Sequence, residues 1–111
     1  MDRRNMQIIK KIKFEINVII KIVDGIDYDF FSSDEKTKRA VCMTFINIGE
    51  LVKNLTDDFR EKHSHVRWRD IAGLRDIAAH RYQTLRTEDI WETIKQDIPI
   101  LYEQISAIER I

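Results

Sequence analysis

Residues 8–23 read IIKKIKFEINVIIKIV, and this stretch decides the fold class of the chain. Its isoleucine and valine residues recur every three or four positions, which is the spacing of one face of an α-helix. We therefore predict a helix over residues 2–23, ended by Gly25. Three further apolar residues, Phe14, Val18 and Ile22, widen the stripe beyond the width that one neighbouring helix would cover. This excess apolar surface indicates contact with a second subunit.

A second long helix is predicted to follow a connection at residues 26–32. Ser33 offers its N-cap, and the apolar spacing carries it to about Leu55. Gly49 lies in mid-helix, where it costs roughly 1 kcal/mol relative to Ala, so it indicates a close approach of another backbone. We expect its neighbour Glu50 to be a solvated or paired carboxylate rather than a catalyst.

The remainder of the chain continues the helical pattern. Thr56 is expected to cap a short helix, a third long helix is predicted over residues 67–82, and Thr87 begins the last helix. Pro99 predicts a kink near residues 97 and 98 rather than a break. The fold class is therefore an all-α, up-down bundle of four longer helices and one short helix, forming a single domain over residues 1–111.

Composition and charge limit the class of protein. The single cysteine, Cys42, excludes an intrachain disulfide and fits a reducing compartment, and its apolar helical surroundings favour a buried hydrophobe over a nucleophile. No apolar run reaches the roughly 18 residues that would span a membrane, and lysines interrupt any N-terminal signal sequence, so we expect a cytoplasmic protein. The formal net charge is zero, so no global field attracts nucleic acid. Residues 60–86 carry a local excess of basic side chains, which a solvated surface would explain equally well.

Residues 75–82, RDIAAHRY, carry the chemistry of the chain. Arg75 can clamp a phosphate through two N–H groups, and His80 can transfer a proton near neutral pH. Asp76 lies one helical turn before His80 and could orient its imidazole. Taken singly, the structural explanation is the commoner one for each: a solvated arginine, a structural histidine and, for Tyr82, a packing aromatic. The combination points to phosphodiester cleavage without a metal.

The helical positions of this segment define two faces. One gathers apolar residues and should face the core: Ile71, Leu74, Ile77 and Ala78. The opposite face mixes small residues with charged ones and has Arg75 at its edge: Trp68, Arg69, Ala72, Gly73, Asp76, Ala79 and His80. A two-fold partner packing on this second face would bring two arginines and two histidines into one cleft.

The Arg-x4-His-x-Tyr arrangement at Arg75, His80 and Tyr82 resembles the signature of HEPN-domain ribonuclease toxins of the HepT type. Ile48-Gly49-Glu50 resembles the Ile-Gly-Glu of that family, and the run from Trp68 to Arg75 resembles its Trp-x-x-Ile-x-Gly-x-Arg. Residues 97–101 resemble its late Pro-x-Leu element. Two positions depart from the family pattern: Asp76 stands where Asn is frequent, and the Pro expected before Trp68 is absent.

The resemblance implies a homodimeric, metal-independent endoribonuclease that needs no cofactor. Arg75 and His80 would be catalytic, with Asp76 supporting them, at a site shared by two subunits. Tyr82 would be the residue that a nucleotidyltransferase antitoxin of the MntA type modifies with AMP. The partners implied are therefore an RNA substrate, a second copy of the chain and that antitoxin, as in a toxin–antitoxin system.

Two alternatives remain open. The same helix could belong to a non-catalytic HEPN module that docks a nucleotidyltransferase and binds nucleotide or RNA, which the zero net charge and Asp76 favour. The chain could also be a purely structural helical dimer. His63-Ser64-His65 has a spacing found in metal sites, but no further ligand set accompanies it in the sequence, so we predict no metal site there.

Overall fold

The computed structural model describes residues 3–80 and 86–110, and every regular element among them is helical. Four helices are longer than ten residues, as the sequence predicts. They are α1 (Arg3–Val23), α3 (Glu35–Lys53), α5 (Trp68–His80) and α7 (Ile98–Glu109). The shorter elements are α2 (Tyr28–Ser33), α4 (Asp57–Lys62), α6 (Thr87–Glu92) and the π-helical turn η1 (Thr93–Asp97). The prediction of a single short helix was therefore wrong.

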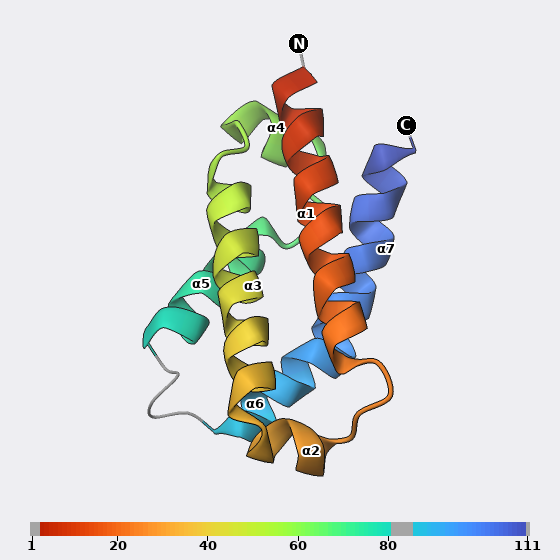
Figure 1. Ribbon diagram of the computed structural model, residues 1–111. Coiled ribbons are helices and arrows are strands. Elements are labelled where there is room, and N and C mark those ends of the chain that lie inside the picture. Colours follow the sequence, from red (N-terminus) through yellow and green to blue (C-terminus); the bar gives the residue numbers. More distant parts are fainter. Residues whose placement is uncertain (1–2, 81–85, 111) are drawn as a thin grey trace.

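The long helices lie side by side in the order α5, α3, α1, α7 (Figure 1). α1 contacts both α3 and α7, and α5 packs on the other side of α3. The chain begins and ends at the same end of the bundle (Figure 1). One continuous core runs between these helices, and its most deeply buried side chains include Phe31, Phe45, Phe59, Ile12, Ile16, Ile48 and Ile105.

The helical spacing of α1 is confirmed. Ile9, Ile12 and Ile16 lie on its fully buried face, as the three-to-four periodicity requires. Of the residues that widen the stripe, Val18 and Ile22 are half-buried and Phe14 is 65% exposed. The extra apolar surface predicted from the sequence is therefore present, most fully at Phe14.

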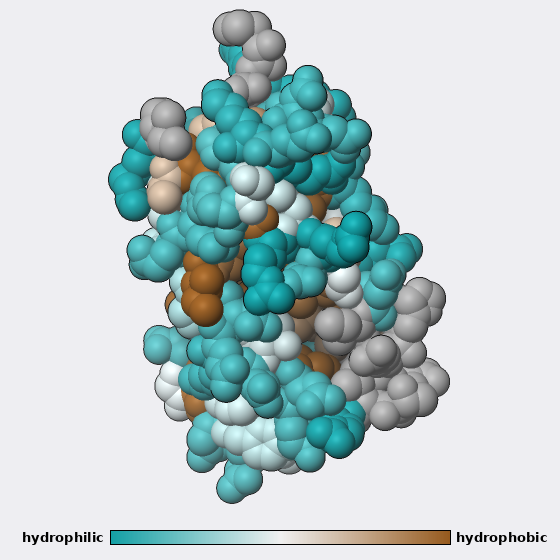
Figure 2. Space-filling view, turned by 180° about the vertical axis from the view of Figure 1, so that it is seen from behind, coloured by the Kyte–Doolittle hydropathy of each residue, from teal (hydrophilic) through white to brown (hydrophobic). Residues whose placement is uncertain are grey.

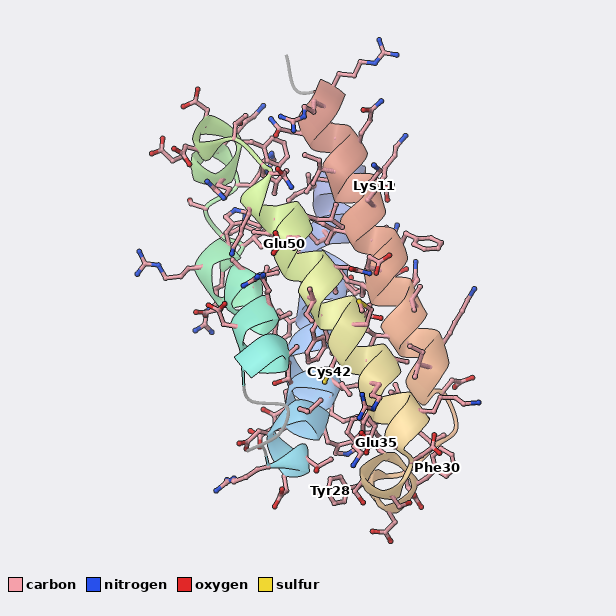
Figure 3. All side chains as sticks on the ribbon, turned by 60° about the vertical axis from the view of Figure 1, so that its left-hand side comes forward. Lys11, Tyr28, Phe30, Glu35, Cys42 and Glu50 are labelled. Carbon is pink, nitrogen blue, oxygen red and sulfur yellow. The ribbon has the colours of Figure 1, made fainter. Side chains whose placement is uncertain are left out.

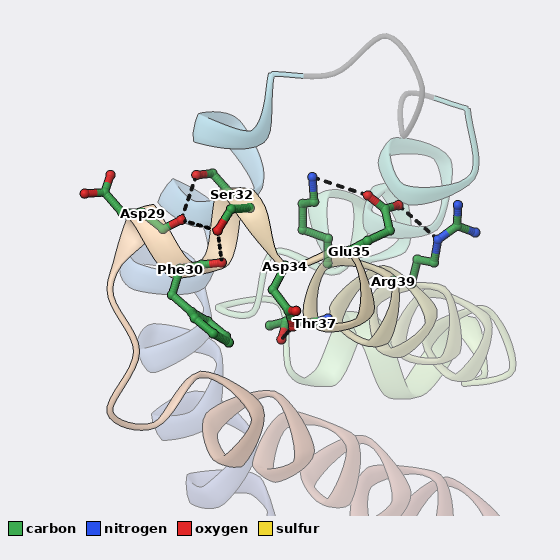
Figure 4. A network of polar contacts seen from close by, with 9 residues as sticks. Asp29, Phe30, Ser32, Asp34, Glu35, Thr37 and Arg39 are labelled. Atoms are coloured by element: carbon green, nitrogen blue, oxygen red, sulfur yellow. Dashed lines mark hydrogen bonds and ion pairs between the residues drawn. The ribbon is translucent and has the colours of Figure 1, made fainter.

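The connection between α1 and α3 differs from the prediction. It contains α2, which begins because the side chain of Asp27 accepts a hydrogen bond from the backbone N–H of Phe30. The N-cap of α3 is Asp34 rather than Ser33, which is the last residue of α2 (Figure 4). Asp34 accepts hydrogen bonds from the hydroxyl and the backbone N–H of Thr37, and these hydrogen bonds lower the pKa of its carboxyl.

The last predicted helix is divided where Pro99 was expected to disturb it. Pro99 has no N–H and its ring would clash with the carbonyl of residue 95 in a regular α-helix. The chain instead widens into η1, in which the N–H of Ile98 bonds to the carbonyl of Thr93. The ribbon changes direction between α6 and α7 (Figure 1).

The surface seen from behind is mainly hydrophilic, with separate hydrophobic patches (Figure 2). Within the described part of the chain, each helix is too short or too polar to cross a lipid bilayer.

Candidate active site

α3 and α5 cross at Gly49. A Cβ atom built on Gly49 would lie 2.7 Å from Cβ of Arg75 and 3.1 Å from the carbonyl oxygen of Ala72. Because any larger residue would force these two helices apart, glycine is required at this crossing. The close approach predicted from a glycine in mid-helix is confirmed, and it occurs against the motif arginine itself.

Glu50, the next residue of α3, forms an ion pair with Arg75 through Oε1 and Nε. Glu50 projects from α3 toward α5 (Figure 3). The side chain of Arg75 is 36% exposed and that of Glu50 is 49% exposed, so water still reaches the pair. The expectation that Glu50 is a solvated or paired carboxylate is therefore confirmed. Its partner could not be identified from the sequence.

Asp76 is the second carboxylate beside Arg75. Its Oδ1 lies 3.4 Å from Nη1 of Arg75, a long contact between adjacent residues. One positive and two negative groups therefore meet at this point, which gives them a formal charge of −1 together. This cluster attracts a phosphate only weakly unless a further cation joins it.

The position of Arg75 follows from how α5 is anchored. Ile71, Leu74 and Ala78 are buried, as the predicted core face requires. Trp68 was expected on the opposite face, and this was wrong: it is 7% exposed, and its indole N–H donates to the carbonyl of His63 at 3.0 Å and to that of Arg60 at 3.2 Å. Trp68 is in the first turn of α5, so its indole reaches the backbone of the segment that precedes the helix. A helical-wheel projection of α5 alone does not include that segment.

The remaining motif residues are less fully placed. His80 is the last residue of α5, but its side chain lies outside the described residues, as do those of Ile77 and Ala79. Tyr82 also lies outside the described residues. The contact expected between Asp76 and His80 stays a prediction for the same reason.

A groove of about 690 Å³ lies beside this helix, between α5 and the segment η1–α7. Arg69, Gly73 and Asp76 line its α5 wall, and Thr93 and Ile100 lie on the other. Asp76 lines this groove and also contacts Arg75, so it lies between the two.

Residues 3–80 and 86–110 contain no group of three or more His, Cys, Asp or Glu side chains placed to hold a metal ion. The rings of His63 and His65 lie 6.2 Å apart at a steep angle, and His63 is buried against Phe59. Cys42 is buried, and this burial raises the pKa of its thiol to about 11. It fits the predicted packing role.

The geometry defines what Arg75 can do. Glu50 engages the guanidinium through Nε, and among the described residues Nη2 has no carboxylate partner. Nη2 can therefore donate to a phosphate oxygen, and Nη1 can join it for a two-oxygen contact only by giving up its long contact with Asp76. The cluster therefore holds one partly exposed cation in a fixed position at the crossing of α3 and α5.

Comparison with known proteins gives a consistent result. Residues 12–108 match the family described as ribonuclease HepT-like. A protein described as a candidate RNase from Caldanaerobacter subterraneus subsp. tengcongensis is 44% identical over 94 residues, which cover 85% of this chain and 84% of that protein. A probable ribonuclease HepT from Thermococcus cleftensis is 34% identical over 110 residues, which cover 99% of this chain and 100% of that protein. No solved structure matches the chain.

Proposed function

Because the chain belongs to the HepT-like ribonuclease family, we propose that it is a metal-independent endoribonuclease and the toxin of a toxin–antitoxin system. It acts without a cofactor, as a cytoplasmic homodimer of a single HEPN domain over residues 1–111. The observation that supports this best is the placement of Arg75, which Glu50 holds through Nε while 36% of the arginine side chain stays exposed.

Cleavage proceeds by attack of a ribose 2′-oxygen on the adjacent phosphorus, with loss of the 5′-oxygen of the next nucleotide. His80 takes the proton from the 2′-hydroxyl, or gives a proton to the departing 5′-oxygen, and water or the second subunit's histidine completes the exchange. Arg75 stabilises the charge that develops on the phosphoryl oxygens. The products are a 2′,3′-cyclic phosphate and a free 5′-hydroxyl, and Asp76 orients the imidazole.

Tyr82 is the point of control in this proposal. A nucleotidyltransferase antitoxin of the MntA type transfers AMP from ATP to the phenolic oxygen of Tyr82 and releases pyrophosphate. The added group is bulky and anionic, so it repels and obstructs an RNA phosphate at the same site.

Purified chain incubated with single-stranded RNA in the presence of EDTA tests the activity. We expect cleavage that survives EDTA, leaves 2′,3′-cyclic phosphate ends, and disappears in both Arg75→Ala and His80→Ala. Either variant cleaving at the unaltered rate would refute the site, and cleavage that stops with EDTA would refute the mechanism.

A non-catalytic HEPN module is the second candidate, and one observation favours it. Two carboxylates, Glu50 and Asp76, already lie beside Arg75, which weakens its attraction for a phosphate. In that case the chain docks a nucleotidyltransferase and binds nucleotide or RNA without cutting it. RNA binding that depends on Arg75, measured in the absence of any cleavage, distinguishes this candidate.

A further inference from the structure

A second hollow, between α1 and α3, has no part in the cleavage proposed above. Its volume is about 360 Å³, within the range of roughly 300–1,000 Å³ that is usual for sites of small ligands. Glu50 lines this hollow and also holds Arg75, so one side chain connects the hollow with the guanidinium. Lys11 of α1 and Glu50 of α3 lie on the same face of the bundle (Figure 3). An RNA strand with a phosphate at Arg75 would therefore bring a neighbouring nucleotide to the hollow.

Phe14 and Leu51 form the apolar part of the hollow, and Phe14 is 65% exposed. The other exposed large apolar side chains of the described residues do not line it: Ile20, Phe30, Met43 and Ile100. A stable contact with another protein covers about 800 Å² on each partner, which one isolated ring does not provide. One exposed ring does provide a stacking surface for one base of a single-stranded nucleic acid. The hollow therefore fits a single planar ring better than the second subunit that the sequence indicated at Phe14.

The polar side chains of the hollow determine which atoms it offers to a ligand. Nδ2 of Asn47 donates to Oε1 of Glu15 at 3.0 Å, and Nδ2 of Asn54 donates to the backbone carbonyl of Glu50 at 3.0 Å. The protein thus holds both amide nitrogens, which leaves the two amide oxygens and Oε2 of Glu15 as acceptors for a ligand. Lys11 is the cation in the hollow, and no carboxylate of residues 3–80 and 86–110 pairs with it. The hollow is therefore rich in acceptors and has one strong donor.

This pattern favours one of the four RNA bases. Guanine carries two adjacent donors, N1–H and its 2-amino group, which match the carboxylate of Glu15 and the amide oxygens. Its acceptors O6 and N7 lie on the other side of the ring, where an ammonium group such as that of Lys11 can donate to them. Uracil has a single donor between two acceptors and satisfies fewer of these atoms. A free phosphate is disfavoured, because the hollow has two carboxylates and one cation.

We propose that this hollow is a subsite for a guanine base of single-stranded RNA, adjacent to the nucleotide whose phosphate meets Arg75. The base stacks on Phe14, donates to Glu15 and accepts from Lys11. The inference rests on the proposed function in taking RNA as the substrate, and it names the base that the substrate carries beside the site.

Binding to an RNA that cannot be cut tests the subsite independently of catalysis. The probes are two short fluorescent 2′-O-methyl oligonucleotides, one of uridine alone and one with a single guanosine among uridines, and the measurement is fluorescence anisotropy. The wild type should bind the guanosine probe roughly tenfold more tightly, because stacking and hydrogen bonds add to the contacts with the backbone. Equal affinity for the two probes would overturn the proposal.

Phe14→Ser tests the stacking surface. It should raise the Kd of the guanosine probe by roughly tenfold and change the Kd of the uridine probe little. Phe30→Ser is the matched control, since Phe30 is 48% exposed and does not line the hollow. An unchanged Kd in Phe14→Ser would overturn the proposal. So would a conversion of dimers to monomers by Phe14→Ser in sedimentation velocity, because the surface would then belong to a second copy of the chain.

Two further comparisons test the polar contacts. Lys11→Gln should weaken binding of the guanosine probe several-fold more than Lys10→Gln, which removes the same charge from the neighbouring position outside the hollow. An inosine probe, which lacks the 2-amino group, should bind more weakly than the guanosine probe to the wild type, and this difference should shrink in Glu15→Gln. Equal effects of the two lysine variants, or equal binding of inosine and guanosine by the wild type, would overturn the assignment of guanine.

The two proposals fail separately. A chain that prefers the guanosine probe through Phe14 but cleaves no RNA removes the proposed ribonuclease and leaves the subsite standing. A chain that cleaves RNA at the same rate in the wild type and in Phe14→Ser, whether or not guanosine lies beside the cut, leaves the ribonuclease standing and removes the subsite.

Discussion

Arg75 on α5 is held from α3 by Glu50, whose Oε1 contacts the guanidinium at Nε. The two residues are far apart in the sequence and meet because Gly49 lets α3 and α5 approach closely. The contact restricts the direction of the guanidinium without covering it. This pairing connects the packing of two helices with the chemistry proposed for the site.

Glu50→Gln should lower kcat/KM for RNA cleavage by roughly tenfold or more, because an arginine without its charged partner samples directions that do not meet the phosphate. Glu109→Gln is the matched control: it breaks the Lys13–Glu109 ion pair, which also joins two helices, at 2.8 Å. Steady-state kinetics and the melting temperature of both variants should be compared. Equal losses of activity in the two would show that Glu50 acts only through stability.

Gly49→Ala should lower the free energy of unfolding by about 1–3 kcal/mol, the usual cost of forcing an extra methyl group into a packed contact. The added Cβ would stand 2.7 Å from Cβ of Arg75, so α5 must shift as well. Urea unfolding measures the effect. The control is Gly73→Ala at a dilution that favours monomers, because its methyl group meets none of the described residues. A similar loss of stability in both variants would contradict this account.

Cys42 should resist alkylation in the native protein. Burial raises the pKa of its thiol to about 11 from an ordinary value of 9.0, so the reactive thiolate at pH 8 is roughly 100-fold scarcer than for an ordinary thiol. Labelling with iodoacetamide should therefore be slow in buffer and fast in urea. It should also accelerate as the pH rises toward 11, because deprotonation then becomes easier. Equal rates in buffer and in urea would show that the thiol is accessible.

Tyr82→Phe should abolish modification by a nucleotidyltransferase antitoxin, because phenylalanine has no hydroxyl to accept AMP. Intact-mass spectrometry after incubation with ATP and the antitoxin is the measurement. We expect the wild type to gain AMP and lose RNA cleavage, while the variant gains nothing and keeps cleaving. An AMP group found on Tyr82→Phe would assign the modification to another residue.

Regular spacing predicted the long helices because each one buries a single stripe of isoleucine, valine or leucine. It could not predict α2, whose six residues are too few to show a period and which depends on a cap at Asp27. The ion-pair partner of Arg75 could not be predicted from the sequence either. Periodicity places residues around one helix, but it does not give the rotation of one helix relative to another. One local signal did exist: Gly49, adjacent to Glu50, marked the crossing.

Trp68 shows the same limit. On the wheel of an isolated helix it falls opposite the core, yet the backbone carbonyls of Arg60 and His63 accept its indole N–H and bury it. The position depends on the loop before α5, which no helical pattern describes. The side chain of His80 and the whole of Tyr82 lie outside the described residues, so their roles are proposed from the family and tested by the experiments above.

The π-helical turn η1 determines which side of α7 faces the core. Ile90, Ile94 and Ile98 are all buried at two successive steps of four residues, which in a regular α-helix would rotate the buried side by about 80°. The extra residue taken up by the π-helical turn absorbs this rotation, so that Leu101, Ile105 and Ile108 still point inward. Deleting one residue between Ile90 and Ile98 would rotate α7 about its own axis. The isoleucines of α7 that are now buried would become exposed, and different side chains would form the wall that faces α5.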